Sequence, residues 1–217
     1  CRHAGCALIG GELAEMPGVY EAGEVDVAGT IVGLVDEDDL LPRLDALAEG
    51  DVLIGLPSSG LHTNGYSLAR RVCFEACELK PQDALPGTGL TVAEALLAPH
   101  RSYLEPLLPQ VKARRLKALA HITGGGLTDN LPRVLPSHLD ACIDTSSWEI
   151  PALFRFLMAK GGMPLEDARR SFNLGVGMVA IAGAAQAPAL LEALHAAGEA
   201  AWILGLLVPG EGLVRYR

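Results

Sequence analysis

The chain has 217 residues, half of them hydrophobic, with a formal net charge of -9 and a pI near 5.1. A chain of this length and composition can bury a sizeable core, so we expect a globular protein. The acidic balance argues against nucleic acid or an anionic membrane as a partner, because both require a basic face. Any phosphate group that the protein binds must therefore meet local donors.

The five cysteines include no Cys-x-x-Cys pair, which favours a reduced, cytoplasmic protein. No segment reaches the roughly 20 apolar residues of a membrane helix, and the first residues lack the length and flanks of a signal peptide. The chain opens on Cys1 and runs at once into apolar sequence. We therefore expect a fragment that begins inside a domain.

Apolar runs predict two strands near the beginning, at residues 6–11 and 25–35, the second suited to a buried position. A loop rich in glycine, proline and glutamate separates them. An acidic stretch broken by proline follows at residues 36–50, and it is the expected crossing between two domains.

From residue 51 onward, predicted strands and helices alternate, which favours an α/β domain. Prolines 106 and 109 are expected to break the leucine-rich stretch before residue 110 into short helices. The last residues, 201–217, are typical of a hairpin that turns at 209–212. The strands are expected at 51–57, 116–122, 140–144 and 175–183, and the longer helices at 66–79, 127–135, 148–162 (closed by Gly161) and 187–198.

Twice, a strand leads a histidine into a glycine-rich loop before a helix, at residues 58–65 and 121–126. Ligands bind at the carboxyl ends of strands in open α/β sheets, and free amides at helix starts favour anions, so phosphate chemistry is indicated. For either loop alone, an ordinary tight turn is an equally good interpretation, and neither matches GxGxxG or GxxxxGK[ST]. The residues concerned are Ser58, Ser59, His62 and Asn64 in the first loop, and His121, Thr123, Gly124, Gly125 and Gly126 in the second.

Two further positions carry residues that suit ligand binding. Glu12 and Glu15 lie in a loop after the first predicted strand, where carboxylates can hold Mg²⁺ together with substrate phosphates. A solvated acidic loop explains them equally well. Asn173 stands just before a strand interrupted by glycine, a pattern that favours close approach of a ligand to the backbone.

Four motifs, in this order and at these separations, carry a specific resemblance: GCALIGGELAEMPGVY, DVLIGLPSSGLHTNGYSLARR, HITGGGLTDNLPRVLP and FNLGVGM. Over essentially its whole length the chain resembles the aminoimidazole ribonucleotide synthetases, or phosphoribosylformylglycinamidine cyclo-ligases, of purine biosynthesis. The resemblance implies an α/β fold in two parts. Residues 1–43 would be the end of an N-terminal α/β domain that binds ATP and dimerises, and residues 44–217 a C-terminal α/β domain with a mixed sheet flanked by helices.

The resemblance also implies the reaction, an ATP-dependent ring closure of formylglycinamidine ribonucleotide by a cytoplasmic homodimer with Mg²⁺. His62 and His121 would then carry protons or donate to phosphate. Glu12, helped by Glu15, would contact Mg²⁺ or ATP. The implied substrate- or phosphate-binding residues are Ser58, Ser59, Asn64, Thr123, Gly124, Gly125, Gly126 and Asn173.

Three positions depart from the family's motifs. Leu13 replaces a threonine in GGETAEMP, His100 stands in the Pro-Thr-Arg segment, and Leu174 replaces the cysteine of FNCGVGM. The family's Asp-Gly-Val-Gly-Thr-Lys stretch is absent from this chain. Two alternatives therefore stay open: another ATP-dependent enzyme of the same architecture, or a truncated module that binds without catalysis.

Overall fold

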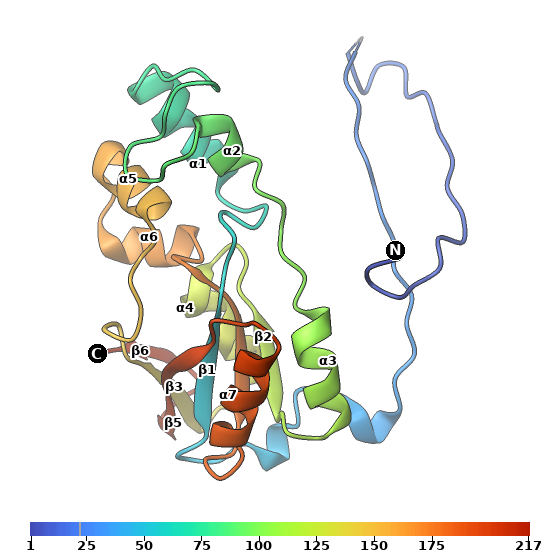
Figure 1. The fold of residues 1–217 in the computed structure, drawn as a ribbon, viewed down its shortest axis with the longest axis vertical. Coiled ribbons are helices and arrows are strands. Elements are labelled where there is room, and N and C mark those ends of the chain that lie inside the picture. The colour runs from blue at the N-terminus through green and yellow to red at the C-terminus, as the bar shows by residue number, and fades with distance from the viewer. Residues whose placement is uncertain (22) are drawn as a thin grey trace. The chain divides into compact units, whose positions relative to one another are not determined.

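The computed structural model describes residues 1–21 and 23–217, and it divides into two units, Cys1–Asp38 and Asp39–Arg217. The described residues of the second unit form a six-stranded sheet of order β2-β4-β1-β5-β3-β6 (Figure 1). Every neighbouring pair is antiparallel except β3 and β6, so the sheet is mixed, as predicted. The strands are β1 (Val52–Pro57), β2 (Ala118–His121), β3 (Leu139–Ile143), β4 (Val176–Ala182), β5 (Trp202–Pro209) and β6 (Val214–Tyr216).

Helices cover both faces of this sheet. Leu53 and Ile54 are consecutive in β1, so their side chains point to opposite faces, and both are fully buried. Leu53 shares a core with α4 and η4, whereas Ile54 shares one with α3 and α7. The helical segments are α1 (Tyr66–Arg70), α2 (Val92–Leu96), α3 (Leu104–Lys112), α4 (Gly126–Asn130), α5 (Ala152–Gly161), α6 (Leu165–Ser171) and α7 (Ala187–Ala196), with the shorter or irregular turns η1 (Glu37–Asp39), η2 (Leu44–Ala46), η3 (Arg71–Ala76) and η4 (Leu131–Val134).

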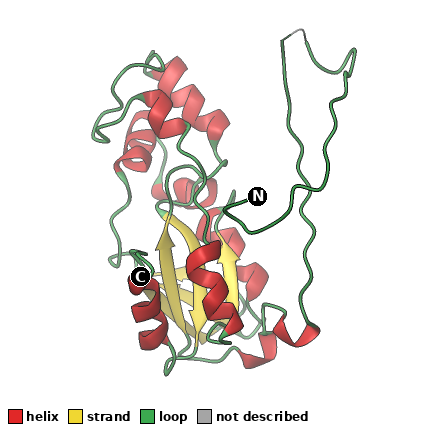
Figure 2. Ribbon diagram, turned by 45° about the vertical axis from the view of Figure 1, so that its right-hand side comes forward, coloured by secondary structure: helices red, strands yellow, loops and turns green. Residues whose placement is uncertain are grey.

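A separate helical cluster lies beyond the end of β1. α1, η3, α2, α5 and α6 pack around a third core that includes Val72, Phe154, Leu157 and Phe172. Figures 1 and 2 show this cluster past the tips of the strands, with the chain entering it from β1. The loop after β1 therefore lies where the sheet and the helical cluster meet. No helix in the described part of the chain is long and apolar enough to cross a membrane.

The predicted C-terminal hairpin is wrong. β5 lies between β1 and β3, while β6 pairs in parallel with the far edge of β3. Asp140 of β3 fixes this return, because its buried carboxylate accepts hydrogen bonds from the amides of Glu211 at 2.7 Å and Leu213 at 2.8 Å. Arg215 of β6 pairs with the same carboxylate. A turn pattern read along the chain does not reveal an acceptor 71 residues away.

Two helix boundaries also differ from the prediction. α3 runs through both Pro106 and Pro109, where breaks were expected. Pro106 lies in the first turn, where an amide needs no partner within the helix, and α3 ends within a turn of Pro109. α5 is closed by Gly162, which adopts the left-handed conformation with φ of 60°, whereas the predicted closing residue, Gly161, is the last residue of the helix.

The structure of the first unit differs from the prediction more than these helices do. The strands predicted at residues 6–11 and 25–35 do not form, and the described residues before η1 contain no strand or helix. Leu8 and Leu34, for example, are 82% and 102% exposed. A strand requires a neighbour for its backbone hydrogen bonds and a core for its apolar side chains. Within the described part of this unit, neither is present.

Candidate functional site

The loop after β1 has a strained backbone. His62 and Thr63 are consecutive non-glycine residues with φ of 52° and 60°, in the left-handed region. Each costs about 1–2 kcal/mol relative to a right-handed conformation. The carbonyl of His62 accepts hydrogen bonds from Thr63 Oγ1 and Asn64 Nδ2, both at 2.6 Å, which stabilise the turn. Strain of this kind clusters at functional sites, so the loop is a candidate ligand loop.

This turn presses the His62 imidazole into the protein, where it is 1% exposed. Its Nε2 accepts a hydrogen bond from the backbone amide of Ser59 at 2.9 Å, so the proton of the neutral ring lies on Nδ1. Nδ1 is buried and has no hydrogen-bond partner among the described residues. Burial, followed by the nearby charges of His100, His121 and Arg101, lowers the pKa of His62 to about 4. The ring is therefore neutral at pH 7.

Gly177 of β4 makes room for this histidine. A Cβ at position 177 would lie 2.0 Å from the Tyr103 hydroxyl oxygen and 2.7 Å from His62 Cε1. Tyr103 in turn donates its hydroxyl proton to the carbonyl of Pro57, at 2.8 Å. The glycine that interrupts β4 thus serves the packing of the loop after β1, which the sequence alone could not assign.

His121, at the end of β2, forms a hydrogen-bonded pair with His100. His100 Nδ1 lies 2.8 Å from the carbonyl of Arg101, which can only accept, so Nδ1 carries the proton and Nε2 is an acceptor. His121 Nε2 lies 2.9 Å from that acceptor and must donate to it. Nδ1 of His121 then retains its lone pair and can act as a base. Burial, followed by the charge of His100, lowers the pKa of His121.

The two predicted amides organise the site. Asn173 Oδ1 accepts hydrogen bonds from Ser58 Oγ and the amide of Gly175, both at 2.9 Å, and its Nδ2 donates to the carbonyl of Gly60 at 2.8 Å. Asn64 Oδ1 lies 3.2 Å from the point that a Cβ on Gly124 would occupy. Asn173 therefore ties the first loop to the start of β4, and Asn64 brings the two glycine-rich loops into contact.

Most backbone amides of the second loop donate hydrogen bonds to carbonyl groups of the protein. Gly125 donates to the carbonyl of Arg170 and Gly126 to that of Thr123, each at 3.0 Å. Thr123 Oγ1 donates to Asn130 Oδ1 at 3.0 Å. Of the three glycines expected to donate to phosphate, only Gly124 has an amide without a bond inside the described structure.

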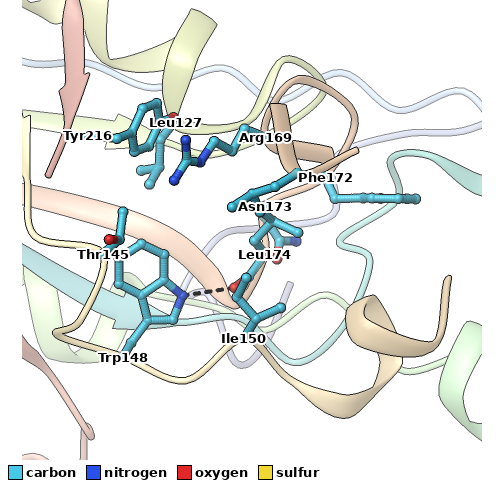
Figure 3. Close-up of a pocket in the computed structure, with 10 residues that line it drawn as sticks. Leu127, Thr145, Trp148, Ile150, Arg169, Phe172, Asn173, Leu174 and Tyr216 are labelled. Atoms are coloured by element: carbon cyan, nitrogen blue, oxygen red, sulfur yellow. Dashed lines mark hydrogen bonds between the residues drawn. The ribbon is translucent and has the colours of Figure 1, made fainter. Parts of the chain in front are cut away.

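An aromatic cavity of about 220 Å³ lies beside the second loop (Figure 3). Arg169 stacks over the Tyr216 ring with its guanidinium carbon 3.9 Å from the ring centroid, and Trp148 Nε1 donates to the carbonyl of Leu174 at 3.0 Å. Flat apolar walls with one guanidinium suit a planar group that carries negative charge. The lining is Leu127, Thr145, Trp148, Ile150, Leu165, Arg169, Phe172, Asn173, Leu174 and Tyr216.

The structure brings together the predicted residues of the two loops and Asn173. Glu12 and Glu15 belong to the first unit, where both are exposed. Sequence reasoning missed His100, which stacks on His62 with ring centroids 3.9 Å apart. Its departure from Pro-Thr-Arg was the only signal available. Sequence separations of 38 and 21 residues from His62 and His121 form no recognisable ligand spacing.

The buried neutral His62 predicts a pH-dependent stability. Its pKa is about 6.5 when unfolded and about 4 when folded, so below pH 6.5 the unfolded chain binds the extra proton. The free energy of unfolding should lose up to about 3 kcal/mol as the pH falls from 6.5 to 4. Urea unfolding with chelator, compared between the native chain, His62→Gln and the exposed-site control His138→Gln, measures this. Equal pH slopes for the native chain and His62→Gln would contradict the assignment.

Comparison with known proteins agrees with the motifs. A family model described as "AIR synthase related protein, C-terminal domain" matches residues 48–216. A phosphoribosylformylglycinamidine cyclo-ligase of Alkaliphilus oremlandii is 43% identical over 210 residues, which cover 97% of this chain and 61% of that protein. A "Bifunctional purine biosynthetic protein ADE1" of Schizosaccharomyces pombe is 44% identical over 212 residues, 97% of this chain and 27% of that protein. The chain thus spans less than two thirds of either relative, and the predicted resemblance is confirmed.

Solved structures support the fold. Thiamine-monophosphate kinase from Stenotrophomonas maltophilia K279a matches with a TM-score of 0.51 at 18% identity, over 78% of this chain and 50% of that one. A hydrogenase maturation protein, HypE, gives 0.53 at 16% identity, over 84% and 53%. At these identities the likeness concerns the fold alone, and it confirms the predicted α/β class.

Proposed function

Because this chain belongs to the family of AIR synthase related proteins, we propose that it is the C-terminal part of a phosphoribosylformylglycinamidine cyclo-ligase. The enzyme would close the ring of formylglycinamidine ribonucleotide with ATP, giving aminoimidazole ribonucleotide, ADP and phosphate. The observation that carries the proposal is the 43% identity to a cyclo-ligase along 97% of the chain. The meeting of the two histidine loops beside β4 supports it.

The reaction requires a group that accepts a proton. ATP phosphorylates the formyl oxygen, a nitrogen of the same molecule then bonds to the formyl carbon, and the carbon–oxygen bond breaks as phosphate leaves. The attacking nitrogen loses a proton in this step. Nδ1 of His121 is suited to take it, because His100 fixes the His121 proton on Nε2. His62, with its pKa near 4, is suited to hold the loop in place rather than to donate a proton.

Substrate binding would use the same loops. Ser58 and Ser59 begin the first loop, and Asn64 joins it to Gly124. The free amide of Gly124 is the backbone donor best placed for an anionic oxygen, since Gly125 and Gly126 donate to carbonyls. Asn173 and Thr123 are positioning residues, because their polar atoms bond within the protein.

The proposal includes ATP and Mg²⁺. Glu12 and Glu15 are exposed carboxylates that make no ion pair within the described residues, and oxygen ligands of this kind fit Mg²⁺. Glu12 would hold the metal and Glu15 would help on the ATP side. Bound Mg²⁺ would neutralise phosphate charge during the transfer.

The proposal also concerns the whole enzyme, a cytoplasmic homodimer that acts on soluble ribonucleotides. Residues 1–43 would complete an N-terminal domain that binds ATP and dimerises, and residues 44–217 would form the C-terminal domain. The greater length of the relatives supports this division. So do the exposed apolar side chains of the first unit, which such a domain would cover.

An assay of ADP release tests the function. The N-terminal segment of the Alkaliphilus oremlandii relative, up to the start of its match, is fused to this chain and supplied with formylglycinamidine ribonucleotide, ATP and Mg²⁺. We expect ADP and aminoimidazole ribonucleotide in equal amounts, with none formed by the N-terminal segment alone. The unfused chain is assayed in parallel.

Other outcomes would redirect the proposal. If the fusion binds the ribonucleotide without turnover, and Leu13→Thr does not restore it, the chain is a binding module. If ADP release requires thiamine monophosphate or another substrate instead, the chain serves a different enzyme of the same architecture.

A further inference from the structure

Three histidines from distant parts of the sequence converge beside the loop after β1. His62, His100 and His121 each offer one ring nitrogen, and these nitrogens lie within 4.8 Å of one another. His62 is buried, His100 is partly buried and His121 is exposed, so the cluster opens to solvent on one side. Such a group matches a three-imidazole metal site with a further coordination position left open.

Neighbouring groups orient these rings, and because His62 stacks on His100 with ring centroids 3.9 Å apart, metal binding would require one of the two rings to turn toward the ion. The carbonyl of Arg101 accepts the Nδ1 proton of His100, an outer bond that orients the ring and leaves Nε2 with its lone pair. Ser59 fixes the edge of His62 through its amide and hydroxyl, at 2.9 and 3.0 Å from Nε2. His62 Nδ1 is buried without a partner among the described residues, and it would become a ligand once its proton moves to Nε2, where the Ser59 hydroxyl can accept it.

We propose that His62, His100 and His121 form a binding site for a divalent transition-metal ion of the zinc type. Imidazole nitrogens suit Zn²⁺, Co²⁺, Ni²⁺ and Cu²⁺, whereas Mg²⁺ prefers oxygen ligands. The metal would take the place of the proton between His100 and His121, and that proton would move to Nδ1 of His121. Because this nitrogen is the base in the proposed ring closure, bound metal would oppose that reaction. Metal binding itself does not depend on the proposed function.

His100 is the ligand whose loss tests the site most directly. A threonine at this position, as in the Pro-Thr-Arg motif of the resemblance, would offer a hydroxyl, which is a poor ligand for zinc beside two imidazoles. His100→Thr therefore restores the motif residue while it removes one ligand. The His100 side chain is partly exposed and belongs to none of the three hydrophobic cores, so the substitution leaves them intact.

Metal titration of the full chain after treatment with chelator tests the proposal. We expect one Co²⁺ per chain, with the visible absorption of a nitrogen-ligated ion, and displacement by Zn²⁺ but not by Mg²⁺. His100→Thr and His121→Ala should each weaken binding at least about tenfold. His138→Ala, which removes an exposed histidine elsewhere, should bind as the native chain does.

The free cysteines provide the main competitor. A thiolate ligand would add a near-ultraviolet charge-transfer band to the spectrum of bound Co²⁺. Such binding would persist in His100→Thr and in His121→Ala. Unchanged affinity in His100→Thr, an equal loss in His138→Ala, or no uptake by the native chain would each overturn the proposal. Unfolding midpoints of the variants, measured in the same buffer, verify that any loss of affinity reflects the ligand and not the fold.

Discussion

Replacing Gly126 with alanine is expected to lower the free energy of unfolding by about 2–5 kcal/mol, the sum of backbone strain and overpacking. Gly126 has φ of 58°, and a Cβ there would lie 2.0 Å from the carbonyl oxygen of Arg169 and 2.7 Å from that of Phe172. Both oxygens belong to backbone at the end of α6, which cannot give way as a flexible side chain can. Urea denaturation at pH 7 measures the loss.

Gly162 provides a matched control. Its φ is 60°, but a Cβ there would have nothing within 4 Å. Gly162→Ala should therefore show the strain alone, about 1–2 kcal/mol. If the two variants lose the same stability, then close packing of the second glycine-rich loop against α6 is not what requires Gly126.

This contact explains why position 126 is a glycine, which the sequence alone did not. Read along the chain, they predict amides open to phosphate. In the structure, Gly126 fits beneath α6, and the Gly125 amide is bonded to the carbonyl of Arg170. The helix that requires Gly126, α6, lies about 40 residues away and was not predicted. Local patterns identify a tight loop, but they do not say what approaches it.

The fold was predictable wherever an element carried its own signal. The apolar run of β1 and the alternation of strands with helices indicated an α/β unit, because burial on both faces leaves a continuous hydrophobic trace. Residues 25–35 show the limit of this signal. They have the composition of a buried strand, yet Val27 and Leu34 are exposed in the structure, since no neighbouring strand is present among the described residues. The composition of a segment shows that it favours a strand, but the strand forms only where a neighbouring strand pairs with it.

The candidate site was likewise predictable only where a residue had a local sequence signal. The two histidine loops were recognisable because each follows a predicted strand. The carboxyl ends of these two strands lie at the same end of the sheet. His100 was not, because its segment has no regular structure and reaches His62 and His121 only through tertiary packing. The proton positions of the cluster follow from its hydrogen bonds with Ser59 and Arg101, which no spacing encodes.

If the proposed cyclo-ligase reaction uses His121 as its base, replacing His121 with alanine should lower kcat of the fused protein by about 10²- to 10⁴-fold, the usual contribution of a positioned base. Nδ1 of His121 keeps its lone pair because Nε2 donates to His100, so the substitution removes the acceptor that we propose for the proton of the attacking nitrogen. KM should change little. The side chain is exposed, and stability should stay within about 0.5 kcal/mol.

The pH profile separates this role from a structural one. Burial and His100 lower the pKa of His121, so kcat of the native fusion should fall with acidification only below the ordinary histidine range near 6.5. His121→Ala should lack that acid limb, and the exposed-site control His138→Ala should keep both the rate and the limb. Assays run with Mg²⁺ and free of transition metals keep the three-histidine cluster unloaded. A loss smaller than about threefold, or an acid limb that persists in His121→Ala, would mean that another group takes the proton.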